Sequence, residues 1–388
     1  MRVCFITFDY PPKIIGGTGT YAETLVKGFR SKGIDLFLIT RGFQSGVDQR
    51  TYSVPSSNSR YWRRLFFIRP ALRLFDKLNK LWKFDVVHFN EPHVMLKKPN
   101  IPTVCTFHST QANEMKLKLA DINTLRTVRD IEDLVLKSTV GSVFDVFTVH
   151  VTDKIIVPSP HLIDLIKSYC FVDYRKICCV PNGIDFEAFD RIDDDPASIL
   201  RKYDLKKDNY VLFIGRLSSL KGVQYLIDAF KVIKKDYINL KLVIVGTGDF
   251  EEYLKNLSNG IAGIVFTGHI DSLNVRTILY RNCAFFVAPS LYEGLPTVVL
   301  EAMTCGKAVV ASRVGGTPLL VRHGQNGFLV KPKDAESIEK SIRVLLENVN
   351  LRENMGAFGR KLVEREFSVN RMVCDTLKVY DSLLDSSN

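Results

Sequence analysis

Residues 283–312 read CAFFVAPSLYEGLPTVVLEAMTCGKAVVAS. Two apolar runs within them, Cys283–Ala288 and Ala308–Ala311, are short enough to be buried strands. Val298–Met303 between the runs predicts a short helix, which Gly306 ends. The stretch is therefore expected to fold as strand, loop, helix and strand, a unit that places ligands beyond the carboxyl ends of its strands.

The loop in this unit combines carboxylates with backbone amides. Glu293 precedes the helix, Glu301 lies just inside it, and Pro296 shapes the backbone between them. The N–H groups of Thr297 and Val298 are then expected to lie free at a helix N-terminus, where phosphate binds. A nearby carboxylate can accept both hydroxyls of a sugar diol, so the spacing suits a nucleotide-sugar. Two glutamates at this spacing are also common on solvated helices.

The whole stretch resembles the donor-site signature of the retaining glycosyltransferases of family 4, E-G-x-x-x-x-x-L-E-A-M-A-x-G-x-P-V-V-A-S. Thr304 and Cys305 replace the usual small pair, and Ala308 replaces the usual proline. The resemblance covers nearly the whole chain. It implies an α/β protein of the GT-B architecture, in which two Rossmann-like domains face an interdomain cleft, and a reaction that needs neither metal nor cofactor.

Composition agrees with a two-domain globular protein. The chain has 388 residues, too many for one hydrophobic core, and 46% of them are apolar. No apolar run approaches the ~20 residues of a membrane helix. The opening run VCFITF is too short for a signal peptide, and the eight cysteines form no C-x-x-C pair, so a reducing cytoplasm is expected.

The formal charge of +11 favours anionic partners. Phosphates, nucleic acid and anionic lipid all fit that charge. Because no RNA- or DNA-binding signature is present, nucleic acid is the least favoured of the three.

The N-terminal segment predicts a Rossmann-like opening. A buried strand, Arg2–Phe8, leads through Gly16 and Gly17 into a helix. The next strand is followed by Arg41 rather than by an acidic ribose ligand, which disfavours a dinucleotide. The glycines can form a plain structural turn, whereas the family resemblance implies that they meet the donor diphosphate.

A further strand, Pro102–Phe107, ends at His108, which is then expected to face the cleft. A lone histidine in such a place is often structural. The resemblance implies that His108 touches the transferred sugar, although Ser109 stands where many family members carry aspartate.

Two cations follow the first strand of the second half. Arg216 and Lys221 come soon after the strand that begins at Tyr210, and together they would clamp a diphosphate. Solvated surface charge is the alternative. The resemblance implies that Glu301 binds the ribose, that Glu293 and His108 hold the sugar, and that further donor contacts come from His269, Ile270, Leu295, Pro296, Thr297 and Val298.

The domain boundaries follow from these motifs. The expected first domain comprises residues 1–185 and a returning helix at 371–388, residues 186–209 are a polar linker, and residues 210–370 form the second domain. Within the linker, the Asp193–Asp195 triplet is better explained as a helix N-cap before Pro196 than as a metal site.

Residues 60–83 read RYWRRLFFIRPALRLFDKLNKLWK. Pro70 is expected to open a helix whose apolar face starts at Ala71 and whose other side is basic. That pattern fits a helix in a membrane interface, and it also fits a core-packing helix with a solvated basic face. The predicted membrane contacts are Trp62, Arg63, Arg64, Lys77 and Lys80.

The expected function is transfer of a hexose-type sugar from a UDP- or GDP-sugar to an acceptor hydroxyl. A lipid-linked or membrane-associated glycan is the favoured acceptor, at the inner face of the cell membrane. A soluble sugar or polysaccharide acceptor is one alternative, and a non-catalytic protein that binds sugar-nucleotides is another.

Overall fold

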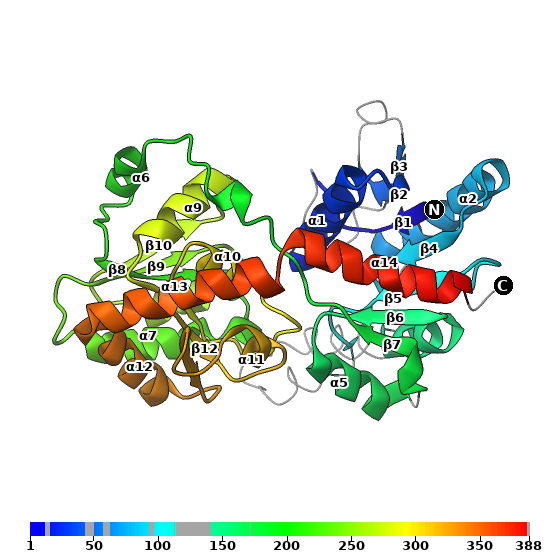
Figure 1. Cartoon of the computed structure of the whole chain (residues 1–388). Coiled ribbons are helices and arrows are strands. Elements are labelled where there is room, and N and C mark those ends of the chain that lie inside the picture. The colour runs from blue at the N-terminus through cyan, green and yellow to red at the C-terminus, as the bar shows by residue number, and fades with distance from the viewer. Residues whose placement is uncertain are drawn as a thin grey trace. The chain divides into compact units, whose positions relative to one another are not determined.

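The computed structural model describes residues 1–11, 16–42, 50–56, 63–92, 97–111, 113, 141–170 and 172–385, apart from the side chains of residues 63–65. The chain forms two compact units, one of Met1–Gly183 with Val369–Asn388 and one of Ile184–Ser368. Each unit has its own sheet and its own helices (Figure 1).

The first unit is built on a parallel sheet in the order β3-β2-β1-β4-β5-β6-β7. Its strands are short and buried because helices cover both faces of a parallel sheet. The strands are β1 (Arg2–Ile6), β2 (Asp35–Arg41), β3 (Thr51–Val54), β4 (Val86–Phe89), β5 (Thr103–Thr106), β6 (Lys154–Val157) and β7 (Ile177–Cys179). The helical elements are α1 (Gly17–Ser31), α2 (Arg63–Trp82), α5 (Pro160–Cys170), η3 (Tyr174–Lys176) and α14 (Val369–Asp385).

The second unit has a parallel sheet in the order β10-β9-β8-β11-β12-β13. Its strands are β8 (Tyr210–Ile214), β9 (Lys241–Val245), β10 (Ile264–Gly268), β11 (Phe285–Ala288), β12 (Val309–Ser312) and β13 (Gly327–Val330). Its helical elements are η4 (Glu187–Phe189), α6 (Pro196–Lys202), η5 (Ser219–Lys221), α7 (Val223–Ile233), α8 (Glu251–Leu257), α9 (Leu273–Asn282), α10 (Thr297–Thr304), α11 (Thr317–Leu320), α12 (Ala335–Glu347) and α13 (Val349–Glu366).

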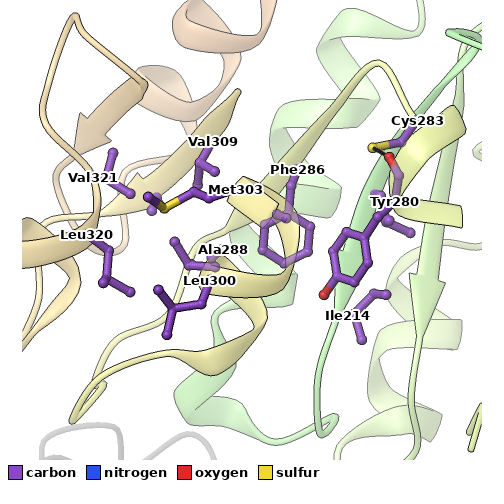
Figure 2. Packing of buried hydrophobic residues seen from close by; sticks show 14 of the residues in the cluster. Ile214, Tyr280, Cys283, Phe286, Ala288, Leu300, Met303, Val309, Leu320 and Val321 are labelled. Carbon is purple, nitrogen blue, oxygen red and sulfur yellow. Dashed lines mark hydrogen bonds between the residues drawn. The ribbon is translucent and has the colours of Figure 1, made fainter. Parts of the chain in front are cut away.

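The unit predicted at residues 283–312 is present as β11, α10 and β12. Phe286 and Val309 on the two strands are fully buried in a core that α10 covers with Leu300 and Met303 (Figure 2). Strand order reverses between β8 and β11, which pair directly. Such a switch point is where doubly wound sheets bind ligands, beyond the carboxyl ends of the strands.

Residues 186–209, expected as a linker, belong to the second unit. They form η4 and α6, and they bury Phe189 and Leu205 in its core. The side chain of Asp195 accepts hydrogen bonds from the N–H groups of Ala197 and Ser198, so this aspartate is an N-cap as predicted. Among the described residues, no cluster of three potential metal ligands is found.

The helix predicted to start at Pro70 starts at Arg63 instead, with Pro70 inside it. The reason is burial, because Phe67 and Ile68 lie upstream of the proline and are almost fully buried. Ala71, Phe75 and Leu78 also pack into the core of the first unit, so most of the apolar face predicted for the membrane is covered by protein.

The rest of α2 remains outside that core. Phe66 and Leu81 are exposed large apolar residues at opposite ends of the helix, and Lys77 and Lys80 are exposed near Leu81. Trp62 lies outside the described residues, as do the side chains of Arg63 and Arg64. Within the described chain, no helix has the length and apolar character needed to cross a membrane.

Candidate active site

The site of the second unit lies where the carboxyl ends of β8 and β11 meet. The turn after β8 and the loop after β11 are tied together by a hydrogen bond from Leu291 N to Leu220 O of 2.7 Å. Gly222 has a φ of 66°, and a Cβ there would lie 2.0 Å from the carbonyl oxygen of Pro289. Only glycine permits this approach, which fixes Lys221 beside the loop.

Lys221 and Glu293 form an ion pair in this site. The Nζ of Lys221 lies 2.6 Å from Oε1 of Glu293, and the Ser290 hydroxyl donates to the same oxygen at 2.7 Å. The side chains of Lys221 and Glu293 are 27% and 11% exposed. Two residues that the sequence assigned to different parts of a donor are therefore in direct contact.

Arg216 lies on the same edge of the sheet but has a different neighbour. Its Nη2 atom is 3.7 Å from Oδ1 of Asp249, in the segment that follows β9, and its side chain is 57% exposed. That distance exceeds a hydrogen bond, and an exposed pair of this kind is weak. The guanidinium can therefore turn to a stronger anion.

Glu301 is buried on α10. The Tyr280 hydroxyl, from α9, donates a hydrogen bond of 3.0 Å to Oε2 of Glu301. Burial raises the pKa of the Glu301 carboxyl, whereas the positive charge of Arg276 and the Tyr280 hydrogen bond lower it. Burial is the larger effect, so the pKa is raised, while Arg276 and Tyr280 offset part of the cost of burying the charge.

The N-terminus of α10 presents backbone donors. Pro296 occupies the N-cap position without a side-chain hydrogen bond, and Val299 N donates to Pro296 O at 3.1 Å. Within the described residues, the N–H groups of Thr297 and Val298 have neither a backbone acceptor nor a side-chain cap. N–H groups placed in this way at a helix N-terminus can bind an anion, which stays a prediction for Thr297 and Val298.

Glycine holds the preceding loop in place. Gly315 has a φ of 50°, and a Cβ there would lie 1.7 Å from the carbonyl oxygen of Glu293. The N–H group of Gly316 donates to the same carbonyl oxygen at 3.3 Å. The segment after β12 therefore fixes the backbone of Glu293, and Leu295 in the same loop is buried.

The segment after β10 contains the residues predicted to meet the base. His269 is exposed, and its Nε2 atom lies 2.9 Å from Oδ1 of Asp271. Ile270 is buried, and its carbonyl oxygen accepts a hydrogen bond of 3.2 Å from Nη1 of Arg276. This carbonyl is therefore held by the protein itself.

In the first unit, His108 follows β5 as predicted. Its Nε2 atom lies 3.0 Å from Oδ1 of Asn90, and its ring meets the edge of Tyr21 with 4.6 Å between ring centroids. Burial lowers the pKa of His108 to about 4, so the ring is neutral at pH 7. Gly16 is the exposed N-cap of α1, and Gly17 begins that helix.

A second buried histidine links the sheet of the first unit to its last helix. His88, on β4, is 2.5 Å from the Tyr380 hydroxyl through Nδ1 and 2.7 Å from Oγ1 of Thr106 through Nε2. Burial lowers the pKa of His88 to about 3. The folded chain therefore keeps this ring neutral at pH values where an unfolded chain protonates it.

We predict that stability decreases on acidification below about pH 6.5, the ordinary pKa of histidine. Since the unfolded state binds the proton more readily, His88 alone should lower the free energy of unfolding by about 2 kcal/mol between pH 7 and 5. Thermal melts across this range should show a smaller decrease for His88→Gln. An unchanged slope in His88→Gln would contradict the prediction.

Comparison with known families shows which class of protein this chain belongs to. Residues 15–188 match the family described as Glycosyltransferase Family 4, and residues 197–362 match Glycosyl transferases group 1. The chain belongs to the family 4, group 1 glycosyltransferases. The predicted family and enzyme class are therefore confirmed.

Relatives of this glycosyltransferase agree. An uncharacterised glycosyltransferase of Methanocaldococcus jannaschii is 27% identical over 98% of each chain. Sucrose-phosphate synthase of Thermosynechococcus elongatus aligns over 100% of both chains with a TM-score of 0.80 and 19% identity. Anabaena HepE in complex with UDP-glucose aligns over 100% of both chains with a TM-score of 0.75 and 18% identity. These neighbours share the GT-B fold, which confirms the predicted fold class.

Within each unit, several residues that contact the predicted site residues were not themselves predicted from the sequence. They are Tyr21, Asn90, Arg276, Tyr280 and Ser290. Ser290 offered a local signal, since a hydroxyl three positions before a carboxylate in a tight loop can reach it. The others act across elements that are distant in sequence.

Proposed function

We propose that this glycosyltransferase transfers a hexose from a UDP- or GDP-sugar to an acceptor hydroxyl, with retention of the α-configuration and without a metal ion. The observation that carries the proposal is the Lys221–Glu293 pair beside the open amides of α10. A nucleotide-sugar offers matching groups, a diphosphate for the cation and the amides, and sugar hydroxyls for the carboxylate.

In this proposal, each residue of the site binds a different part of the donor. Lys221, Arg216 and the α10 amides stabilise the charge that develops on the departing diphosphate. Glu301 accepts the ribose hydroxyls. The hydrogen bond from Tyr280 to Oε2 fixes the carboxylate in the orientation for this contact. Backbone groups at His269 and Ile270 hold the base.

The sugar is held by Glu293 and His108. A neutral imidazole both donates and accepts, so His108 suits sugar hydroxyls at pH 7. For proton transfer we propose that an oxygen of the leaving diphosphate takes the acceptor proton as the new glycosidic bond forms on the same face. No separate general base is required by this route.

We predict an α-linked product and activity that survives EDTA. UDP-glucose is the first donor to test, because the HepE structure of similar fold contains it. Proton NMR of the product distinguishes the two anomers, and a parallel assay with EDTA tests the metal. A β-linked product, or activity restored only by Mn²⁺ or Mg²⁺, would contradict the mechanism.

For the acceptor, we propose a lipid-linked glycan reached by reversible contact of α2 with an anionic membrane. The support is the exposed face of this helix, where Arg73, Lys77 and Lys80 lie with exposed Leu81 beside them. Each basic residue near an anionic surface contributes roughly 1 kcal/mol. The likeness to sucrose-phosphate synthase favours a soluble sugar acceptor instead.

Co-sedimentation with vesicles containing anionic lipid tests the membrane contact. We expect binding at low salt that weakens at high salt and is lost when Arg73, Lys77 and Lys80 are replaced by Glu. The control replaces Lys206, Lys207 and Lys235, exposed lysines of the second unit, in the same way and should still bind. Binding that is absent at low salt would leave the soluble acceptor as the better proposal.

A further inference from the structure

Helix α9 carries two polar side chains that reach separate parts of the proposed nucleoside site. Arg276 and Tyr280 lie one turn apart, so they project from the same face of the helix. Neither side chain is itself one of the proposed donor ligands.

Tyr280 reaches α10. Its side chain is fully buried, and its ring packs against Phe286 with 5.4 Å between ring centroids (Figure 2). The hydroxyl lies 3.0 Å from Oε2 of Glu301 and 3.3 Å from the carbonyl oxygen of Val298. A ring fixed in the core thus holds the carboxylate from one side.

Arg276 reaches the segment after β10. Its Nη1 atom donates to the carbonyl oxygens of Ile270 at 3.2 Å and Asp271 at 2.8 Å. Its positive charge also acts on the buried carboxylate of Glu301. Arg276 therefore fixes the segment that is expected to hold the base. It also favours the ionised form of Glu301, which is expected to hold the ribose.

We propose that Tyr280 and Arg276 are positioning residues for the nucleoside half of the donor. The inference rests on the proposed function. Because both project from one rigid helix, they set the spacing between the Glu301 carboxylate and the backbone at 270–271. Neither residue is needed for the diphosphate, which binds at Lys221 and the α10 amides in the proposed mechanism.

The test compares UDP and GDP with inorganic pyrophosphate, which has no ribose or base, by isothermal titration calorimetry. Tyr280→Phe keeps the ring and should weaken the nucleoside diphosphate about tenfold, with pyrophosphate unchanged. In turnover, KM for the donor should increase while kcat at saturation stays within about twofold. Arg276→Gln should show the same separation.

Tyr237→Phe is the matched control, because the Tyr237 hydroxyl also donates to a glutamate, Glu347, but outside the site. This variant should bind both ligands as the wild type does. Equal binding of the nucleoside diphosphate by Tyr280→Phe and wild type would overturn the inference alone, as would an equal loss of pyrophosphate. A wild-type protein that binds neither UDP nor GDP would overturn the proposed function itself.

Discussion

Replacing Lys221 with alanine should lower kcat/KM for the donor by about a hundred- to a thousandfold, the usual cost of losing one charge-stabilising donor. Lys221 is held at the switch point of the sheet by the close contact of Gly222 with Pro289. Its ammonium would stabilise the diphosphate as the glycosidic bond breaks. Steady-state kinetics with saturating acceptor measure the effect.

The loss should be catalytic rather than structural. The fold of the second unit is expected to survive, which circular dichroism and thermal melts can verify, and Lys221→Met keeps the apolar stem if alanine destabilises. Lys340→Ala is the control, because Lys340 pairs with Glu336 on an exposed helix face. Near-normal turnover by Lys221→Ala would remove the diphosphate clamp from the mechanism.

Gly315→Ala should lower kcat/KM by about a hundredfold, although residue 315 carries no functional side chain. A Cβ at this position would lie 1.7 Å from the carbonyl oxygen of Glu293, so the loop must shift. A displacement of about 1 Å in a catalytic arrangement costs around a hundredfold in rate. Kinetics and melting temperature should be measured on the same preparation.

Gly324→Ala separates backbone strain from this collision. Gly324 has a φ of 79°, but nothing lies within 4 Å of a Cβ built there. Alanine in the left-handed region costs about 1–2 kcal/mol, so the control should lose stability and keep its activity. Equal activity in the two variants would show that the Gly315 contact does not position Glu293.

Much of the fold could be predicted because its strands are buried on both faces. Runs such as Phe285–Ala288 are continuous and apolar, and glycine or proline ends them, so local pattern suffices. Helix α2 shows where that reasoning fails. Its pattern does not distinguish lipid from protein as the partner of an apolar face, and the core of the first unit takes that face.

The candidate site, like the fold, could be predicted from the sequence only in part. Glu293, Glu301 and the α10 amides lie within one short stretch, so their spacing indicates a ligand for them. The contact of Tyr280 with Glu301 and that of Asn90 with His108 each join different secondary-structure elements. Such pairs depend on tertiary packing, which the local periodicity of the sequence does not predict.

The ion pair between Lys221 and Glu293 also gives the cation of the site its own counter-ion. A donor entering as proposed does not meet an uncompensated cation; it exchanges partners, with its diphosphate taking the ammonium and its hexose taking the carboxylate. A ligand that brings only phosphates, such as pyrophosphate, takes the ammonium but gives the buried carboxylate nothing in return. Under the proposed function, pyrophosphate should therefore bind Lys221 more weakly than an intact nucleotide-sugar does, and the ion pair itself contributes to selectivity for the donor.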